Sequence, residues 1–449
     1  MLCHPIYATD YKVDKEYIKA NFDFIPKKGE SHKDELTGLS ITRLTDASEL
    51  VGTKDALIVY SRYSPENSNQ KFVIIFGSNS TSSWIVNRKT QEVLTELTDA
   101  KDKSIGEKNE IRWDGSGKYP NRVYYRSNMA LYQIDDILNK DQTTSLIYDF
   151  SKHSRVSTRI YNDVEGDSSN DSDHWAFMAA HYNGKTQVLD AFIHYQISTG
   201  IINILKPSDL AGTDLNHYAN KKNIPRPNMV EISPNGTGMI IHYNKAWGNE
   251  VYGNRPKDKN TWFDGPHLWP LNLNHKDQEP IKVAISSTHS GWAFNENNEE
   301  LFISQNNSSD KFDAVKITGS NSGYKNKYEF FSHSDIGWSN GFHFGKMNSL
   351  KSNWVFVSTY SNTKSKNFNT SWGEDQLVML RLSTNPLQSN VWRIIPTYNK
   401  YSGHYRDEAA AAINFTGNRV YLTSNWGGKL DHREVFSIDL PETWHSDLD

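Results

Sequence analysis

The chain of 449 residues contains a single cysteine, Cys3, which excludes an internal disulfide framework and a CxxC zinc module. It also lacks any apolar run close to the ~20 residues that a membrane-spanning helix needs. Its N-terminus lacks the charged and then apolar pattern of a secretory signal peptide. We therefore expect a cytosolic protein or an exported one already processed, and composition does not choose between them.

The chain also lacks an excess of charge of one sign. Its 49 basic residues face 53 acidic ones, which gives a formal net charge of −4. This balance argues against general nucleic-acid binding, which usually requires a strongly basic domain. With 12% aromatic residues and a mean hydropathy of −0.70, the chain is too aromatic for disorder and too polar for a membrane protein. We expect a folded monomer with no nucleic-acid or membrane partner.

Signatures of common enzyme classes are absent: there is no GxSxG elbow, Walker loop, HExxH motif or GxGxxG motif. Helical patterns are scarce, and the best amphipathic stretch covers residues 14–22. The rest of the sequence consists of short β-runs broken by Asn, Gly, Ser and Asp, which is typical of an all-β protein.

These β-runs form a repeat. Each unit has an apolar run, a polar turn rich in Asn and Gly, and a second apolar run that ends in small or polar residues. The clearest unit joins Met229–Ile232 to Met239–Tyr243, and another joins Ala410–Phe415 to Val420–Ser424. Most units are followed by one or two further strands. Four strands repeated about every 45–65 residues are typical of propeller blades.

We therefore predict an all-β fold in which residues 1–449 form one seven-bladed β-propeller with four-stranded antiparallel blades. Residues 1–50 are an N-terminal segment that can supply a closing strand. The predicted blades cover roughly residues 55–100, 105–150, 151–205, 222–285, 286–340, 341–398 and 402–440. Six or eight blades, or a pair of β-sandwich domains, are the alternatives.

Propeller geometry predicts where a site would lie. The start of the first strand and the end of the second strand of each blade are neighbours on one face, around a central basin. His153 and His181 occupy these two positions in the third blade, and Arg226 and Tyr243 occupy them in the fourth. Taken singly, each has an ordinary structural explanation, but together on one face they indicate a catalytic site. His174 is a reserve candidate.

Two metal sites are weaker hypotheses. His289, His343 and His404 stand near equivalent positions of later blades, and could converge on a transition metal. The acidic insert at residues 163–173 has the oxygens that calcium prefers but lacks the spacing of an EF-hand, so a solvated loop is the favoured reading. A structural Ca or Zn ion is therefore an open prediction.

A propeller with His153, His181, Arg226 and Tyr243 around its basin resembles the seven-bladed ulvan lyases of polysaccharide lyase families 24 and 25. It resembles oligogalacturonate lyases more distantly. The resemblance implies a lyase that cleaves ulvan, a sulfated polysaccharide containing uronic acid, by β-elimination, with no required cofactor. It also implies a secreted or periplasmic enzyme.

The resemblance implies a role for each residue. Arg226 would neutralise the uronate carboxylate, with Arg255 as the alternative. His181 would be the base, with His153 orienting it or sharing the carboxylate, and His174 could replace His181. Tyr243 would protonate the leaving oxygen. Tyr218 is a second candidate for the tyrosine.

An anionic polysaccharide would need a locally basic groove, because the net charge gives no attractive field overall. The cations available near the predicted site are Arg226, Lys245, Arg255, Lys257, Lys259 and Arg406. Trp247, Tyr252 and Trp262 could stack on sugar rings or pack against the propeller. A non-catalytic propeller that binds glycans or proteins, and a propeller glycoside hydrolase, are the alternative functions.

Overall fold

The fold is known from a computed structural model of the chain. The residues that this structure describes are 13–17, 20–139, 142–211, 227–243, 262–286, 289–337, 340–361, 371–383 and 391–448. Arg226, Tyr218 and Arg255 lie outside them. None of the helices in this described part is both long and apolar enough to cross a membrane.

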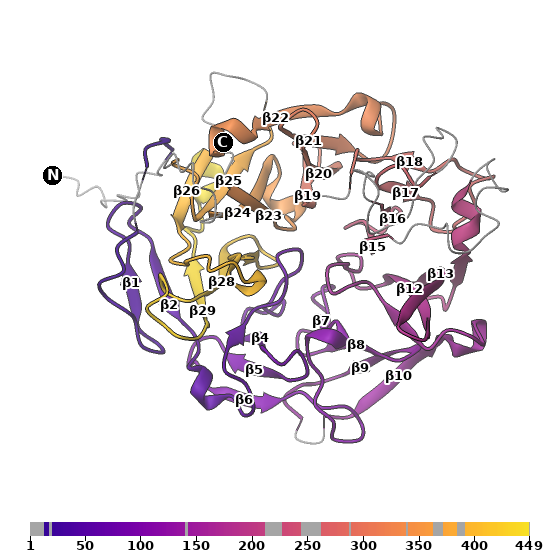
Figure 1. The fold of residues 1–449 in the computed structure, drawn as a ribbon, viewed down its shortest axis with the longest axis horizontal. Helices are drawn as coiled ribbons and strands as arrows, with labels where there is room; N and C mark the ends of the chain where they lie inside the picture. Colours follow the sequence, from indigo (N-terminus) through magenta and orange to yellow (C-terminus); the bar gives the residue numbers. More distant parts are fainter. Residues whose placement is uncertain are drawn as a thin grey trace.

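Seven antiparallel sheets follow one another in chain order around a ring, as Figure 1 shows. Within each of the first six sheets the strands are hydrogen-bonded in sequence order, and the first strand of each lies nearest the centre of the ring. This arrangement confirms the predicted seven-bladed β-propeller. The seventh sheet has a fifth strand at its outer edge.

The first three blades come from the first half of the chain. Blade one contains β3 (Ala56–Leu57), β4 (Phe72–Gly77), β5 (Ser83–Asn87) and β6 (Val93–Glu96). Blade two contains β7 (Arg112–Trp113), β8 (Val123–Ser127), β9 (Ala130–Ile134) and β10 (Thr144–Asp149). Blade three contains β11 (Arg159–Tyr161), β12 (His174–Asn183), β13 (Thr186–Gln196) and β14 (Ile202–Leu205).

The next three blades repeat this plan. Blade four contains β15 (Met229–Ile232), β16 (Met239–His242), β17 (His267–Trp269) and β18 (Ile281–Lys282). Blade five contains β19 (Ser290–Phe294), β20 (Glu300–Asn306), β21 (Lys311–Lys316) and β22 (Tyr328–Ser332). Blade six contains β23 (Asn340–Phe344), β24 (Trp354–Ser361), β25 (Gln376–Arg381) and β26 (Val391–Pro396).

Blade seven joins the two ends of the chain. From the centre outward it contains β27 (Ala412–Ile413), β28 (Arg419–Ser424), β29 (Glu434–Asp439), β2 (Ser40–Arg43) and β1 (Ser31–Lys33). Two short α-helices occur in the described residues, α2 (His333–Ile336) and α3 (Trp444–Leu448). The described residues of the predicted amphipathic helix at 14–22 are not helical, so that prediction is wrong. There Arg393 binds the Glu16 carbonyl and pairs with Asp14, which gives the segment tertiary partners instead.

The core lies between neighbouring blades rather than inside any one of them. In β4 every residue is buried, and alternate residues belong to different clusters. Val73 and Ile75 pack toward blade seven, whereas Ile74 and Phe76 pack toward blade two. Side chains of successive strand residues point to opposite faces, and both faces of a blade are covered by neighbours. This explains why the inner strands read as continuous apolar runs.

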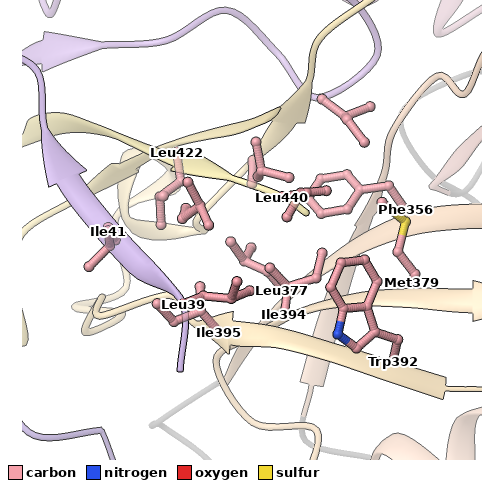
Figure 2. Packing of buried hydrophobic residues seen from close by; sticks show 14 of the residues in the cluster. Leu39, Ile41, Phe356, Leu377, Met379, Trp392, Ile394, Ile395, Leu422 and Leu440 are labelled. Atoms are coloured by element: carbon pink, nitrogen blue, oxygen red, sulfur yellow. The ribbon is translucent and has the colours of Figure 1, made fainter. Parts of the chain in front are cut away.

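The junction of blades six and seven carries the largest of these clusters. Figure 2 shows Leu39 and Ile41 of the N-terminal segment packed with Leu377, Ile395 and other residues from the last two blades. The N-terminal residues are therefore part of the core of the C-terminal blade.

Hydrogen bonds and one buried ion pair close the ring. β2 pairs antiparallel with β29, with Ile41 opposite Ile438. The buried Glu434 carboxylate accepts hydrogen bonds from Arg43 at 2.6 Å, from the Thr45 hydroxyl at 2.6 Å and from the Ala47 amide at 3.0 Å. One carboxylate on the C-terminal strand thus satisfies three groups of the N-terminal segment.

Glu434→Ala should destabilise the protein by about 3–5 kcal/mol, because it leaves the buried Arg43 guanidinium without its counter-charge. Denaturant unfolding of the variant and the wild type measures this difference. Asp439→Ala on the same strand is the matched control: its carboxylate is 66% exposed and pairs with Arg419. We expect the control to lose less than about 1 kcal/mol. Equal losses in the two variants would contradict the role of Glu434 in closing the ring.

Candidate functional site

The acidic insert at residues 163–173 packs against residues from several blades. The Glu110 carboxylate of blade two accepts hydrogen bonds from the Asn162 and Val164 amides. Asp167 pairs with Arg112 of blade two at 3.4 Å and with Lys346, which follows β23 of blade six, at 2.8 Å. Ser168, Ser169 and Ser172 of the insert are buried. The favoured reading of this insert as a solvated loop is therefore wrong.

The backbone of the insert is anchored as well. Two backbone hydrogen bonds join the insert to blade four. The Ile232 amide of that blade donates to the Asp167 carbonyl, and the Asn170 amide donates to the Pro234 carbonyl of that blade. The Tyr63 hydroxyl of blade one donates to the Val164 carbonyl at 2.8 Å. Because blades one, two, four and six all contact it, the insert links the inner parts of these blades.

A cavity of about 380 Å³ lies among the inner strands of the ring. We call it the axial cavity, and its described lining residues come from six of the seven blades. The residues that line it are Tyr60, Ser61, Arg62, Glu165, Asn228, His289, Ser290, Gln305, Asn307, His343, Phe344 and Tyr405. Tyr405 is 52% exposed and Arg62 is 2% exposed, so the cavity extends from solvent to buried residues.

A buried ionic network adjoins the axial cavity. Arg62 donates to the Ser290 hydroxyl at 2.7 Å and pairs with Glu231. Glu231 also accepts hydrogen bonds from His242 at 2.8 Å and from the Trp292 indole at 3.0 Å. Burial opposes ionisation of Glu231, but Arg62 and these donors outweigh it and lower its pKa to about 2. The charge of Arg62 is thus already balanced inside the protein.

Two histidines of the axial cavity stack on each other. The rings of His289 and His343 have centroids 4.8 Å apart. Nδ1 of His343 lies 3.3 Å from the Tyr60 hydroxyl, and its Nε2 lies 3.4 Å from a Glu408 carboxylate oxygen. Burial lowers the pKa of His289 to about 3 and that of His343 to about 4. Both rings are therefore neutral at pH 7.

His404 does not join them as the metal hypothesis requires. Its Nδ1 accepts a hydrogen bond from the Arg406 amide at 3.1 Å, which makes it the cap of a short 3₁₀ turn. Within the described ranges, no group of three or more His, Cys, Asp and Glu side chains is arranged to hold a metal ion.

Glu165 places a titratable group in the axial cavity. Its carboxylate lies 3.4 Å from the Asn228 amide nitrogen. Burial raises the pKa of Glu165 to about 7, although Arg62 acts in the opposite direction. This carboxyl group therefore changes charge near neutral pH.

A histidine and an aspartate form a dyad at the end of blade three. His181 follows the buried part of β12, and its Nδ1 lies 2.9 Å from both carboxylate oxygens of Asp190 on β13. The Ser157 hydroxyl donates to the same carboxylate at 2.8 Å. An ionised carboxylate only accepts hydrogen bonds, so Nδ1 of His181 carries the proton and Nε2 carries the lone pair.

The Nε2 atom of His181 is available for chemistry. The His181 side chain is 28% exposed, and among the described residues its Nε2 has no hydrogen-bond partner. This fixed tautomer, with a carboxylate behind it and an accessible lone pair, is what a general base requires.

The other predicted site residues have separate neighbours. His153 Nε2 is hydrogen-bonded to the Tyr148 hydroxyl at 2.8 Å, and within the described part of the chain it shares no hydrogen bond with His181. Tyr243 is fully buried, with its ring edge-on to Phe263 at 5.1 Å. His174 stacks on His194, with Nδ1 to Nε2 at 3.0 Å. Their catalytic roles stay predictions.

The predicted basic groove is described only in part. Arg406 forms a two-pronged ion pair with Glu107, so its charge is neutralised. Trp262 packs edge-on against Trp269 at 5.2 Å and is half-buried. The remaining members of the groove that lie outside the described residues are Lys245, Trp247, Tyr252, Lys257 and Lys259.

Sequence reasoning missed Asp190 and most of the axial cavity. Asp190 is the single acidic residue in the run Val188–Tyr195, and an isolated charge in an apolar strand is a signal of a specific partner. Arg62 and Glu165 carry no such signal, because both stand among polar residues and their partners are distant in the sequence.

No protein-family model matches the chain, and no curated protein matches it in sequence. Among solved structures, oligogalacturonate lyase from Vibrio parahaemolyticus is similar, with a TM-score of 0.59 and 12% identity over 93% of this chain and 100% of that chain. Hydrazine synthase from Kuenenia stuttgartiensis gives a TM-score of 0.46 at 9% identity, over 89% of this chain and 97% of that chain. The first likeness shows the fold: the chain is a seven-bladed β-propeller.

Glu165→Gln should stabilise the protein more at pH 8 than at pH 5. Since the pKa of Glu165 is about 7 in the folded protein and near its ordinary value when unfolded, wild-type stability is lost as pH rises through about 7. The variant cannot ionise, and we expect a gain on the order of 2–3 kcal/mol at the higher pH.

Melting temperatures at the two pH values measure this effect, with Ser61→Ala as an uncharged control from the same cavity. The control should show the same difference from wild type at both pH values. A pH-independent difference for Glu165→Gln would contradict the raised pKa.

Proposed function

We propose that the protein is a polysaccharide lyase that cleaves a uronate-containing anionic polysaccharide of the ulvan type by β-elimination. The observation that carries the proposal is the His181–Asp190 dyad, which presents an accessible imidazole lone pair at the rim of blade three. The propeller fold supports it, because a structure with the same fold is named as an oligogalacturonate lyase.

The chemistry follows from what each group supplies. Nε2 of His181 takes the C5 proton of the uronate, and the electron pair of that C–H bond forms the C4–C5 double bond. The C4–O4 bond breaks, and O4 receives a proton from an acid, for which Tyr218 is the candidate, because the Tyr243 side chain is fully buried. No water is consumed and no cofactor is required.

An arginine makes the C5 proton removable. The carboxylate next to C5 opposes a second negative charge, and a bidentate guanidinium offsets this charge in the enolate-like intermediate. Arg226 is the proposed residue, with Arg255 as the alternative. Arg62 does not suit this task, because Glu231 already balances its charge.

Asp190 is a positioning residue in this proposal. Its carboxylate accepts a hydrogen bond from Nδ1 of His181, so that the lone pair of the neutral imidazole lies on Nε2. It also stabilises the imidazolium that forms when the C5 proton is taken.

The activity itself is tested with ulvan, and with pectate, alginate and heparin as comparison polyanions. The expected result is a rise in the ultraviolet absorbance of the unsaturated uronate with ulvan. Release of reducing ends without this absorbance would contradict the proposal, and would favour hydrolysis by carboxylates such as Glu165 and Glu408. No change with any substrate would contradict it as well.

His181→Ala should lower kcat by roughly 10²–10⁴-fold, because it removes the base. Asp190→Asn should lower kcat by at least roughly tenfold and change the pH profile, since an asparagine does not fix the tautomer in the same way. His432→Ala is the matched control: His432 is 24% exposed and binds Asp431 and Glu434 on blade seven. It should retain activity.

The assignment of His181 would be wrong if His181→Ala and His432→Ala had equal activity in the same assay. An unchanged pH profile in Asp190→Asn would contradict the positioning role of Asp190. Melting curves of all three variants verify that they are folded.

A further inference from the structure

The axial cavity takes no part in the proposed elimination, yet buried polar atoms in and beside it lack hydrogen-bond partners that a ligand could supply. Arg62 Nε and His289 Nδ1 are buried and have no hydrogen-bond partner among the described residues. Nε2 of His343 is also buried without a hydrogen bond, at 3.4 Å from Glu408. Buried polar groups are seldom left unpaired, so molecules with several hydroxyl groups suit this cavity.

The lining combines flat rings with amides and carboxyl groups. Tyr405 is 52% exposed and Tyr60 is half-buried, so both offer ring surface close to the opening. Asn228 and Asn307 add amide groups that can donate and accept. Aromatic faces beside such groups match a pyranose ring, which has apolar faces and a polar edge.

Charge decides which kind of sugar fits. Glu165 lines the cavity and Glu408 lies at His343, whereas the one cation among the described lining residues, Arg62, is balanced by Glu231. His289 and His343 are neutral at pH 7. The cavity therefore offers carboxylates without a compensating free cation, which disfavours a second carboxylate.

We propose that the axial cavity is a second carbohydrate-binding site, and that it takes a neutral pyranose unit. Its volume of about 380 Å³ accommodates one or two sugar units. The site is distinct from the His181–Asp190 dyad, and the proposal holds whether or not the protein is a lyase. In a polysaccharide that contains both uronate and neutral sugars, such a site binds the neutral units.

The test is calorimetric titration of the full chain with methyl β-D-xylopyranoside, methyl β-D-galactopyranoside and methyl β-D-glucuronide. At pH 8 we expect millimolar binding of at least one neutral glycoside, and binding of the glucuronide at least about tenfold weaker. Glu165→Gln should reduce this discrimination at least about threefold, because it removes one of the two opposing charges.

Tyr405→Ala should weaken binding of the neutral glycoside at least about fivefold, because the stacking surface is lost. Tyr182→Ala is the matched control: Tyr182 is 53% exposed, nearly the same as Tyr405, but it lies on β12 beside His181. It should leave the affinity unchanged. Melting curves exclude a folding defect in each variant.

Three results would overturn the proposal: no binding of any glycoside, equal or tighter binding of the glucuronide to the wild type at pH 8, or equal effects of Tyr405→Ala and Tyr182→Ala. The titrations are independent of the elimination assay. Binding of neutral glycosides without formation of an unsaturated product would support this proposal and contradict the proposed lyase function.

Discussion

The pairing of β2 with β29 closes the ring, and the other features of the molecule depend on that closure. Each blade buries both of its faces against neighbours, so an open ring would leave two apolar faces and two unpaired strand edges in water. The Glu434 carboxylate fixes the closing strand by binding Arg43, Thr45 and the Ala47 amide. The largest core cluster joins residues near position 40 to residues beyond position 420.

A closed ring brings the inner strands together, and this creates both the electrostatic network and the axial cavity. The acidic insert lies among the inner strands, where Asp167 meets Arg112 and Lys346. Arg62 and Glu231 balance each other beside the cavity. Most buried charges near the axis thus form ion pairs with one another. The groups that are left to bind a ligand include neutral histidines and carboxyl groups of raised pKa. This is why we assign the elimination to the rim of blade three and assign neutral-sugar binding to the axis.

Much of the fold could be predicted from the sequence, because blades depend on local patterns. Apolar runs separated by Asn-Gly turns mark hairpins wherever they occur, and Met229–Ile232 with Met239–His242 is such a pair in the structure. The predicted helix over 14–22 failed for the opposite reason. Its described residues are held by Arg393, which lies far away in the sequence, and no local pattern reports such a partner.

The sequence by itself determined the fold class, the number of blades and the presence of histidines near blade ends, since period and composition encode these features locally. Only the tertiary structure decided which histidine is hydrogen-bonded to a carboxylate and which one caps a 3₁₀ turn. His181 meets Asp190 because the pairing of β12 with β13 shifts register between Ala179 and Ala180, so that Asp190 has no partner directly opposite it, whereas His404 bonds the backbone of its own turn. Arg62, Glu165 and His343 share a cavity because ring closure brings together strands that are far apart along the chain. Proximity of this kind depends on the register and on the order of the blades, and no single stretch of sequence contains it.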